Sequence, residues 1–265
     1  TNSLHQKGFN FYRTKNSLAA TIVAASRMNT LIRTQAPLLT MKYVEGNDRL
    51  AELQFVDQVI AGVASFPPRR LALGTMVRSI LQQVVRLHVY LNDYDDVPEY
   101  LNHEKIVVHR SQDHTDRGDA GKFWGVQDHN GYYLSLDDDL VYPHGYAARM
   151  IAGVEAYGRK ALVSLHGADL PHRKFENYYD DRTARYRCLD AVAFDQQAHV
   201  PGTGVSAFHT SIVKVNPRRD FPINNMADVW VGKLCIEQKV PVVVLAHNAG
   251  YIKLIRGTNK DSIYE

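Results

Sequence analysis

The chain has 265 residues, of which 45% are hydrophobic, 22% charged and 10% aromatic. This composition is that of an ordinary globular protein, and it excludes a mainly disordered, collagen-like or coiled-coil chain. The net charge of +3 is too small to indicate a protein that mainly binds a nucleic-acid backbone. We therefore expect a folded protein of enzyme size whose partners do not include nucleic acid.

The first 50 residues are more basic than the rest of the chain. They carry seven Lys or Arg residues against two acidic ones, Glu45 and Asp48, a local excess of +5. We interpret residues 1–57 as a helical extension that packs on the core. A second interpretation stays open, in which residues 1–50 contact anionic lipid or a partner domain.

Neither a membrane span nor a cysteine-based framework is predicted. The longest weakly polar stretch near the start, 18–25, is far shorter than the roughly 20 apolar residues that cross a bilayer. Cys188 and Cys235 lie 47 positions apart and indicate neither a disulfide framework nor a structural zinc site. We expect a cytoplasmic protein, peripheral at the inner face of the membrane if residues 1–50 bind lipid. Because the chain starts at Thr1 without a methionine or a signal-peptide pattern, we expect either a trimmed chain or an excised domain of a larger protein.

Short β-rich runs alternate with helical patterns from Gln58 onward. The runs read as buried strands and occupy residues 59–64, 87–91, 106–108, 132–136, 162–165 and 242–245. Between the first two, one apolar stripe predicts a helix that starts near Pro67, and further helices are predicted from about Pro143 and Met226. This alternation predicts an α/β fold with a largely parallel sheet.

Residues 166–200 interrupt this alternation, because they are crowded with Tyr, Asp, Arg and His. We expect this segment to cover a site. The run that follows, 201–209, is spaced by glycines and has two interpretations of equal weight. It is either an ordinary turn that leads into a strand or a loop that approaches a substrate.

Three adjacent carboxylates, Asp137, Asp138 and Asp139, come directly after the apolar run 132–136. The carboxyl end of a strand is the usual ligand side of an open α/β sheet. Carboxylates of this kind suit Mg²⁺ or Mn²⁺, which bridge a few protein oxygens to substrate phosphates. An isolated acidic triplet is more often a solvated turn that caps the next helix, so the assignment needs further features.

Three such features occur in the sequence. The run 118–122, Gly-Asp-Ala-Gly-Lys, is a glycine-spaced loop that ends in a cation and suits phosphate oxygens. Asp228 stands at a predicted helix start, where it is either a cap or a functional acid. His247 ends the last predicted strand and is a residue type that completes an oxygen-rich metal site.

The order of these elements resembles the GT-A glycosyltransferases, particularly bacterial family-2-like enzymes that use nucleotide sugars. Those enzymes have a nucleotide-binding βαβ start, a DxD metal motif, a later acid at a helix start and a C-terminal metal-binding histidine. The resemblance covers residues 58–255 and rests most on the run 131–143, Gly-Tyr-Tyr-Leu-Ser-Leu-Asp-Asp-Asp-Leu-Val-Tyr-Pro. It implies a GT-A (Rossmann-like) domain over residues 58–265, with 166–210 as the acceptor and lid region.

The resemblance also implies roles for single residues. The uracil and ribose of the donor would lie against Ala64, Ser65, Phe66, Arg69, Asn92 and Asp93. Lys122 would face the base or the pyrophosphate, and Asp137 and Asp138 would lie beside the nucleotide. Asp139 would bind the Mn²⁺ or Mg²⁺ ion, together with Asp137 and His247. Asp228 would be the general base that deprotonates the acceptor hydroxyl.

By this resemblance the chain is an inverting, metal-dependent glycosyltransferase. It would move a sugar from a nucleoside diphosphate, UDP being the expected one, to a glycan or glycolipid hydroxyl, as in bacterial surface polysaccharide synthesis. Ala227 precedes Asp228 where many family members have a second acid, so the base role rests on Asp228 alone. No Gln-x-x-Arg-Trp run follows, which favours a non-processive enzyme or one module of a larger polymerase.

Two other functions stay open. A nucleotidyltransferase acting on sugar phosphates would share the sheet and the acidic metal ligands. It would normally carry a Gly-x-Gly-x-Arg signature where this chain has Ser-Phe-Pro-Pro-Arg at 65–69. A non-catalytic carbohydrate-binding or scaffold domain would keep the fold, but the joint presence of the DxD carboxylates, Asp228 and His247 speaks against loss of activity.

Overall fold

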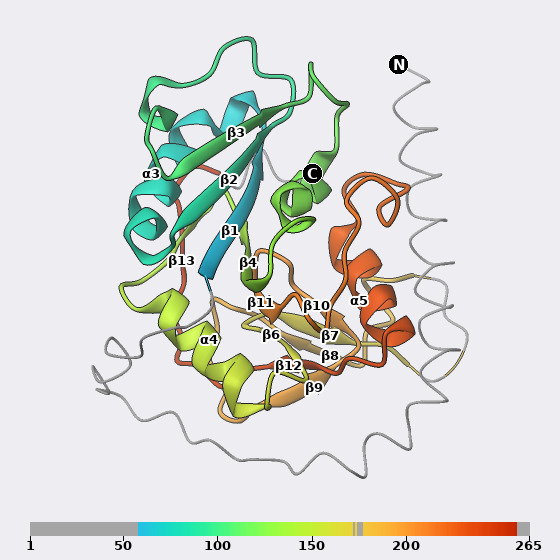
Figure 1. Cartoon of the computed structure of the whole chain (residues 1–265). Helices are drawn as coiled ribbons and strands as arrows, with labels where there is room; N and C mark the ends of the chain where they lie inside the picture. The colour runs from blue at the N-terminus through green and yellow to red at the C-terminus, as the bar shows by residue number, and fades with distance from the viewer. Residues whose placement is uncertain (1–57, 172, 174–176, 259–265) are drawn as a thin grey trace.

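The computed structural model describes residues 58–171, 173 and 177–258, and the predicted extension 1–57 lies outside them. A central sheet of eight strands organises the described part (Figure 1). In spatial order its strands are β3 (Ile106–Arg110), β2 (Arg86–Leu91), β1 (Gln58–Ser65), β4 (Gly131–Asp137), β11 (Val205–His209), β6 (Leu162–Ser164), β12 (Val242–Val244) and β9 (Gln196–Ala198).

Parallel pairing dominates this sheet. Strands β3, β2, β1 and β4 all run parallel, and β12 runs parallel to β6. Strand β11 is antiparallel to both of its neighbours, β4 and β6, and β9 is antiparallel to β12. The predicted α/β class with a mostly parallel sheet is therefore confirmed, and each of the six predicted strands is present.

Alternating side chains bury both faces of the sheet. On β1, Ala61 joins one apolar cluster with Leu73 and Met150, whereas its neighbour on the strand, Ile60, joins a second cluster with Phe123. This follows from the two-residue period of a strand, because successive side chains point to opposite faces. Helices therefore cover both faces and leave the ends of the strands as the place for a site.

Three α-helices provide that cover. The predicted helix near Pro67 forms as a 3₁₀ turn, η3 (Pro67–Arg69), followed by α3 (Arg70–Ile80). Helix α4 (Tyr146–Ala156) packs on the same face, and α5 (Ala227–Glu237) packs on the opposite face. The remaining short 3₁₀ segments are η4 (Leu81–Gln83), η5 (Glu99–Leu101) and η6 (Gly118–Val126).

Smaller sheets complete the described part. One contains β10 (Val200–Pro201), β7 (Gly167–Asp169) and β8 (Ala184–Tyr186), and another pairs β13 (Lys253–Leu254) with β5 (Leu140–Val141). The predicted irregular segment 166–200 thus carries three short strands, β7, β8 and β9. No helix among the described residues has the length and apolar character to cross a bilayer.

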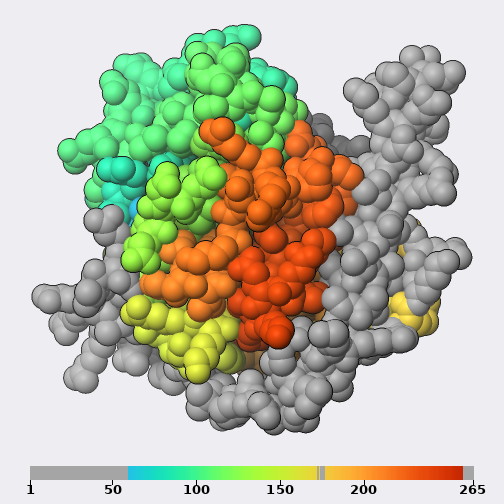
Figure 2. All heavy atoms as spheres, turned by 45° about the vertical axis from the view of Figure 1, so that its right-hand side comes forward, coloured from blue at the N-terminus to red at the C-terminus, as the bar shows by residue number. Residues whose placement is uncertain are grey.

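Segments far apart in the sequence meet around one end of the sheet. In Figure 2 the orange surface of the chain after residue 200 adjoins the green surface of the segment that precedes β4. Hydrogen bonds between Asn224 and Asp116, and between Ala227 and Asp119, fix this contact. The site described next lies along it.

Candidate functional site

The carboxyl ends of three parallel strands meet at one cavity. Ala64 at the end of β1 pairs in register with Asp137 at the end of β4. Asn92, just after β2, donates its backbone N–H to the Ser65 carbonyl at 2.8 Å. The cavity has a volume of about 350 Å³. It is lined by Ala64, Ser65, Phe66, Arg69, Asn92, Asp93, Asp116, Gly118, Asp119, Lys122, Asp137, Asp138, Asp139, Thr203, Asn225 and Asp228.

Every residue predicted from the sequence for the donor, the base and the metal lies in this lining, with the exception of His247. Several of them stand at or just after a predicted strand, and parallel strands end at the same edge of a sheet. Lys122 was indicated by the glycine-spaced run 118–122 and Asp228 by its place at a predicted helix start. The lining also contains residues that the sequence analysis did not single out as functional, namely Asp116, Asp119, Thr203 and Asn225. Asp119 lies in the glycine-spaced run 118–122 and Thr203 in the run 201–209. Both residues therefore belong to runs that the sequence analysis had already pointed out.

Arg69 compensates two carboxylates of the acidic triplet. Its guanidinium lies 2.7 Å from Asp139 and 3.5 Å from Asp138, and its side chain is only 6% exposed. The 3₁₀ turn after Pro67 brings Arg69 inward from the start of α3. The loop after β1 thus provides a cation that faces the end of β4.

Lys122 makes the second ion pair of the cavity. Its ammonium group contacts the Asp137 carboxylate and lies 3.4 Å from the Thr203 hydroxyl. The segment η6 carries this side chain over the sheet, where it is 4% exposed. Burial lowers the pKa of Lys122, but the charges of Asp137, Asp119 and Asp228 outweigh it and raise that pKa above its ordinary value. Lys122 is therefore a permanent cation.

Burial acts on the remaining acids of the triplet in the opposite direction. It raises the pKa of Asp138 to about 7, although Ser65 and Arg69 both favour the ionised form. Burial and then the nearby Asp137 charge raise the pKa of Asp139 as well. Two cations thus only partly compensate the carboxylates, and the cavity favours the arrival of more positive charge.

Asp228 is held in place by the loop before β11. Its Oδ1 accepts hydrogen bonds from the Thr203 backbone N–H at 2.8 Å and from the Thr203 hydroxyl at 2.6 Å. It stands in the first turn of α5, where the helix dipole favours a negative charge. The carboxylate is thereby oriented, and no Lys or Arg of the described residues forms an ion pair with it. This is the arrangement that a general base requires.

Gly204 allows β11 to pass close to the acidic triplet. A Cβ atom at this position would overlap the Asp137 carboxylate. The Tyr142 hydroxyl also ties the two strands together, since it donates to the Gly204 carbonyl at 2.6 Å and accepts the Asp137 N–H at 2.8 Å. The run 201–209 is thus a turn that leads into a strand, and its residue Thr203 also lines the cavity.

Two residues that were predicted to contact the nucleotide sugar, Asn92 and Ser65, form hydrogen bonds within the protein. The Asn92 amide donates to the Gly118 carbonyl at 3.0 Å and accepts the Arg117 N–H at 3.0 Å. It therefore secures the loop that precedes Lys122. The Ser65 hydroxyl lies 3.0 Å from the Tyr94 hydroxyl and is buried. Both residues line the cavity.

His247 is not brought to the cavity. Its backbone pairs with Val192, and its ring nitrogens lie 2.7 Å from the Leu245 carbonyl and 3.3 Å from the Arg187 carbonyl. The side chain is 2% exposed. A strand-end position fixes where the side chain begins, but the pairing of His247 with Val192 and its ring contacts fix where the side chain lies. The metal-ligand role of His247 stays a prediction.

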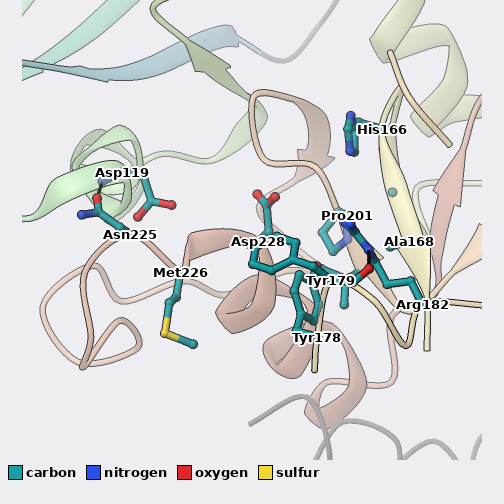
Figure 3. Close-up of a pocket in the computed structure, with 12 residues that line it drawn as sticks. Asp119, His166, Ala168, Tyr178, Tyr179, Arg182, Pro201, Asn225, Met226 and Asp228 are labelled. Carbon is teal, nitrogen blue, oxygen red and sulfur yellow. Dashed lines mark hydrogen bonds between the residues drawn. The ribbon is translucent and has the colours of Figure 1, made fainter. Parts of the chain in front are cut away.

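A second, smaller cavity lies on the other side of Asp228. Its volume is about 40 Å³, and its lining includes Tyr178, Tyr179 and Arg182 from the predicted lid region (Figure 3). Asp119, Asn225 and Asp228 line both cavities and therefore form the wall between them. In Figure 3 the Asp228 carboxylate points into the space between Asp119 and His166.

The carboxylate oxygens that line the larger cavity suit a hard divalent cation. Among the described residues no three His, Cys, Asp or Glu side chains are grouped to hold a metal by themselves. Mg²⁺ commonly binds to one or two carboxylates and completes its shell with phosphates and water. Asp137 and Asp139 fit that mode, because both line the cavity and neither is buried away from it.

Comparisons with known proteins find similarity only at a low level. No protein-family model and no curated protein matches the chain. A197 from STIV is similar in structure, with 13% identity, a TM-score of 0.42, and coverage of 74% of this chain and 83% of that one. The mannosyltransferase PcManGT from Pyrobaculum calidifontis, solved with GDP-Man and Mn²⁺, has 13% identity, a TM-score of 0.47, and coverage of 89% and 67%. Neither likeness is strong enough to indicate a function.

Proposed function

We propose that this chain is an inverting, metal-dependent glycosyltransferase that takes a nucleoside diphosphate sugar and passes the sugar to a hydroxyl group. The observation that carries the proposal is the single cavity in which the acidic triplet, two buried cations and an oriented carboxylate meet. Its volume of about 350 Å³ lies in the range of small-molecule sites.

The balance of charge supports a metal ion. Seven aspartates line the cavity, whereas its lining cations are Arg69 and Lys122. A diphosphate would be repelled by such a wall unless a divalent cation accompanied it. Asp137 and Asp139 would hold Mn²⁺ or Mg²⁺, and His247 would join them only by releasing its two carbonyl contacts. The bound metal would compensate the charge that develops on the leaving diphosphate.

The chain's own residues would divide the remaining work. Ala64, Phe66 and Asp93 would contact the nucleoside, and Lys122 would face the pyrophosphate as a permanent cation. UDP is the nucleotide that we expect from the sequence. Asp228 would accept the proton of the acceptor hydroxyl, because it is oriented by Thr203 and open to both cavities.

The smaller cavity supports an approach of the acceptor from the far side of Asp228. Inversion requires the base and the leaving group to lie on opposite faces of the anomeric carbon. A volume of about 40 Å³ is too small for a sugar ring, so the segment that contains Tyr178 and Tyr179 would have to move for a glycan or glycolipid to enter. Aromatic rings at this place offer apolar faces to a sugar.

Donor binding provides the direct test. Thermal unfolding is measured with UDP, with Mn²⁺, and with both, followed by a screen for nucleotide release from UDP-, GDP- and CMP-sugars that includes GDP-mannose. We expect a clear rise of the unfolding midpoint only when nucleotide and metal are both present. A rise with a sugar polymer alone, and no release of nucleotide from any donor, would contradict the transferase and favour a carbohydrate-binding domain.

A further inference from the structure

Asp119 lies in the wall between the two cavities, and the mechanism proposed above gives it no role. It belongs to the first turn of η6 and lines both cavities together with Asn225 and Asp228. Figure 3 places its carboxylate beside Asn225 and on the same side as the start of α5. This half-buried acid thus contacts the segment that carries the proposed base.

Two hydrogen bonds join Asp119 to the segment that leads into α5. The Asp119 backbone N–H donates to Asn225 Oδ1 at 3.2 Å, and the Ala227 backbone N–H donates to Asp119 Oδ2 at 2.9 Å. Each segment thus donates one hydrogen bond to the other, although Asp119 and Ala227 are 108 positions apart in the sequence. We call this pair of bonds the 119–227 clasp. Ala227 is the residue directly before Asp228, so the clasp acts at the backbone that carries the proposed base.

Helix α5 depends on the clasp because it has no side-chain cap of its own. Met226 occupies the N-cap position and makes no capping hydrogen bond. The first N–H groups of a helix have no partner within the helix and need one from outside. A carboxylate is also favoured there by the helix dipole. Asp119 thus supplies from a distant segment what Ser, Thr, Asp or Asn normally supplies locally.

The backbone on both sides is shaped for this contact. Gly118 and Asn225 adopt left-handed conformations with φ of 50° and 60°. A Cβ atom at Gly118 would overlap the Asn225 side-chain oxygen. Left-handed backbone is costly for residues with a side chain, and such strain persists only where the surroundings impose it. The two loops are therefore adapted to each other at the edge of the cavity.

We propose that Asp119 is a positioning residue for the transfer reaction, which acts through the clasp by fixing the first turn of α5 and with it the carboxylate of Asp228. The inference rests on the proposed function, since it assigns to Asp228 the role of base. Thr203 orients the Asp228 side chain from one side, and the clasp fixes its backbone from the other. A displacement of a reacting group by about 1 Å is sufficient to lower the reaction rate by about 10²-fold.

Two substitutions separate the clasp from the charge of Asp119. Asp119→Ala removes the oxygen that accepts the Ala227 N–H, whereas Asp119→Asn keeps an oxygen that accepts it and removes only the charge. Gln238→Ala is the matched control. The Gln238 side chain, just after α5, also accepts a backbone N–H from another segment, that of Lys214 at 2.7 Å, and lines neither cavity.

The first readout does not depend on activity. Amide hydrogen exchange at residues 227–229 is measured without ligand, and we expect it to be about fivefold faster in Asp119→Ala, as for a lost helix cap, and near wild type in Asp119→Asn. Equal exchange in Asp119→Ala and wild type would overturn the clasp itself. The exchange measurement tests the clasp even if the chain releases nucleotide from no donor. The absence of nucleotide release would count against the proposed function and not against the clasp.

The second readout is steady-state transfer with the donor identified by the screen. We expect kcat of Asp119→Ala to fall at least about tenfold with donor KM within about twofold of wild type. Asp119→Asn should restore kcat to within about threefold, and Gln238→Ala should leave it unchanged. A loss of kcat in Asp119→Ala no larger than in Gln238→Ala, or no rescue by Asp119→Asn, would overturn the positioning role.

Discussion

The two cavities on either side of Asp228 are built in different ways. Half of the residues that line the larger cavity stand at or just after the ends of parallel strands, such as Ser65, Asn92 and Asp137. The smaller cavity is lined by residues from loops and from the two- and three-residue strands between 166 and 201. Strand register places the side chains of the first cavity, whereas contacts between distant loops place those of the second.

This difference has a consequence for function. A wall built on a buried sheet is rigid, because its backbone hydrogen bonds and its packing hold it from both faces. A wall built on short strands and loops has fewer such constraints. The larger cavity therefore suits a donor and a metal, which need fixed oxygen positions. The smaller one suits an acceptor whose entry requires movement.

Removal of one metal-binding carboxylate would test the rigid wall and has the largest expected effect. Asp139→Asn should abolish turnover and metal-dependent UDP binding, measured by calorimetry with UDP and Mn²⁺. Without metal its free energy of unfolding should equal or exceed that of wild type, because burial and Asp137 already disfavour the ionised form of Asp139.

The control for this variant is Asp96→Asn. Asp96 is an exposed acid that forms an ion pair with Arg70 at 2.7 Å outside the cavity. Its substitution should leave turnover and UDP binding unchanged. A cooperative loss of folding in Asp139→Asn would show instead that the acidic triplet serves as a structural turn.

Asp228 stands at the boundary of the two cavities, and its substitution should separate binding from transfer. Asp228→Asn keeps an oxygen that accepts both hydrogen bonds from Thr203, so the variant should fold and bind UDP with Mn²⁺ normally. It cannot take a proton, and transfer should fall by at least about 10²-fold. Near wild-type transfer, measured as release of UDP in the presence of acceptor, would remove Asp228 from the mechanism.

A histidine pair in the strand-built part should make that part sensitive to acid. His88 Nδ1 lies 2.9 Å from His109 Nε2, and burial lowers the pKa of each to about 4, with further lowering by neighbouring charge. Between about pH 4 and 6.5 the unfolded chain then binds more protons than the folded one. Stability should therefore rise with pH across this window and be lost on acidification.

The size of this effect is on the order of 1 kcal/mol per group, since both rings are partly exposed. Chemical unfolding of wild type and His109→Gln at several pH values measures it. We expect the free energy of unfolding to depend less steeply on pH in the variant than in wild type. Parallel curves for the two proteins over this window would mean that the pair is not protonated differently on folding.

The lid prediction has the smallest expected effect and concerns the loop-built wall. The described part of the segment, residues 177–200, should exchange its amide hydrogens faster than β1 and β4 in the free protein. Donor and metal should slow that exchange by a few fold, because ordering of the wall would accompany binding. Equal protection with and without UDP-sugar and Mn²⁺ would contradict a lid at this place.

The sequence alone determined the α/β class and the six strands, and it indicated most of the residues that line the larger cavity. These features follow from local rules. Apolar runs become buried strands, a 3.6-residue period becomes a helix face, and side chains directly after parallel strands meet at one edge. Asp137, Asp139 and Asp228 could be found this way because each stands next to such an element.

Only the tertiary structure decided how those residues are partnered. It pairs Arg69 with Asp139 and Lys122 with Asp137, and it uses the Asn92 amide to secure a loop. It directs the His247 ring to two carbonyls away from the cavity, although its place after a strand had suggested a ligand. It also brings Asp119 to the start of α5 across 108 positions. Such contacts depend on the packing of segments that are distant in the sequence. Residue periodicity and motif spacing describe only neighbouring residues, so they do not predict these contacts.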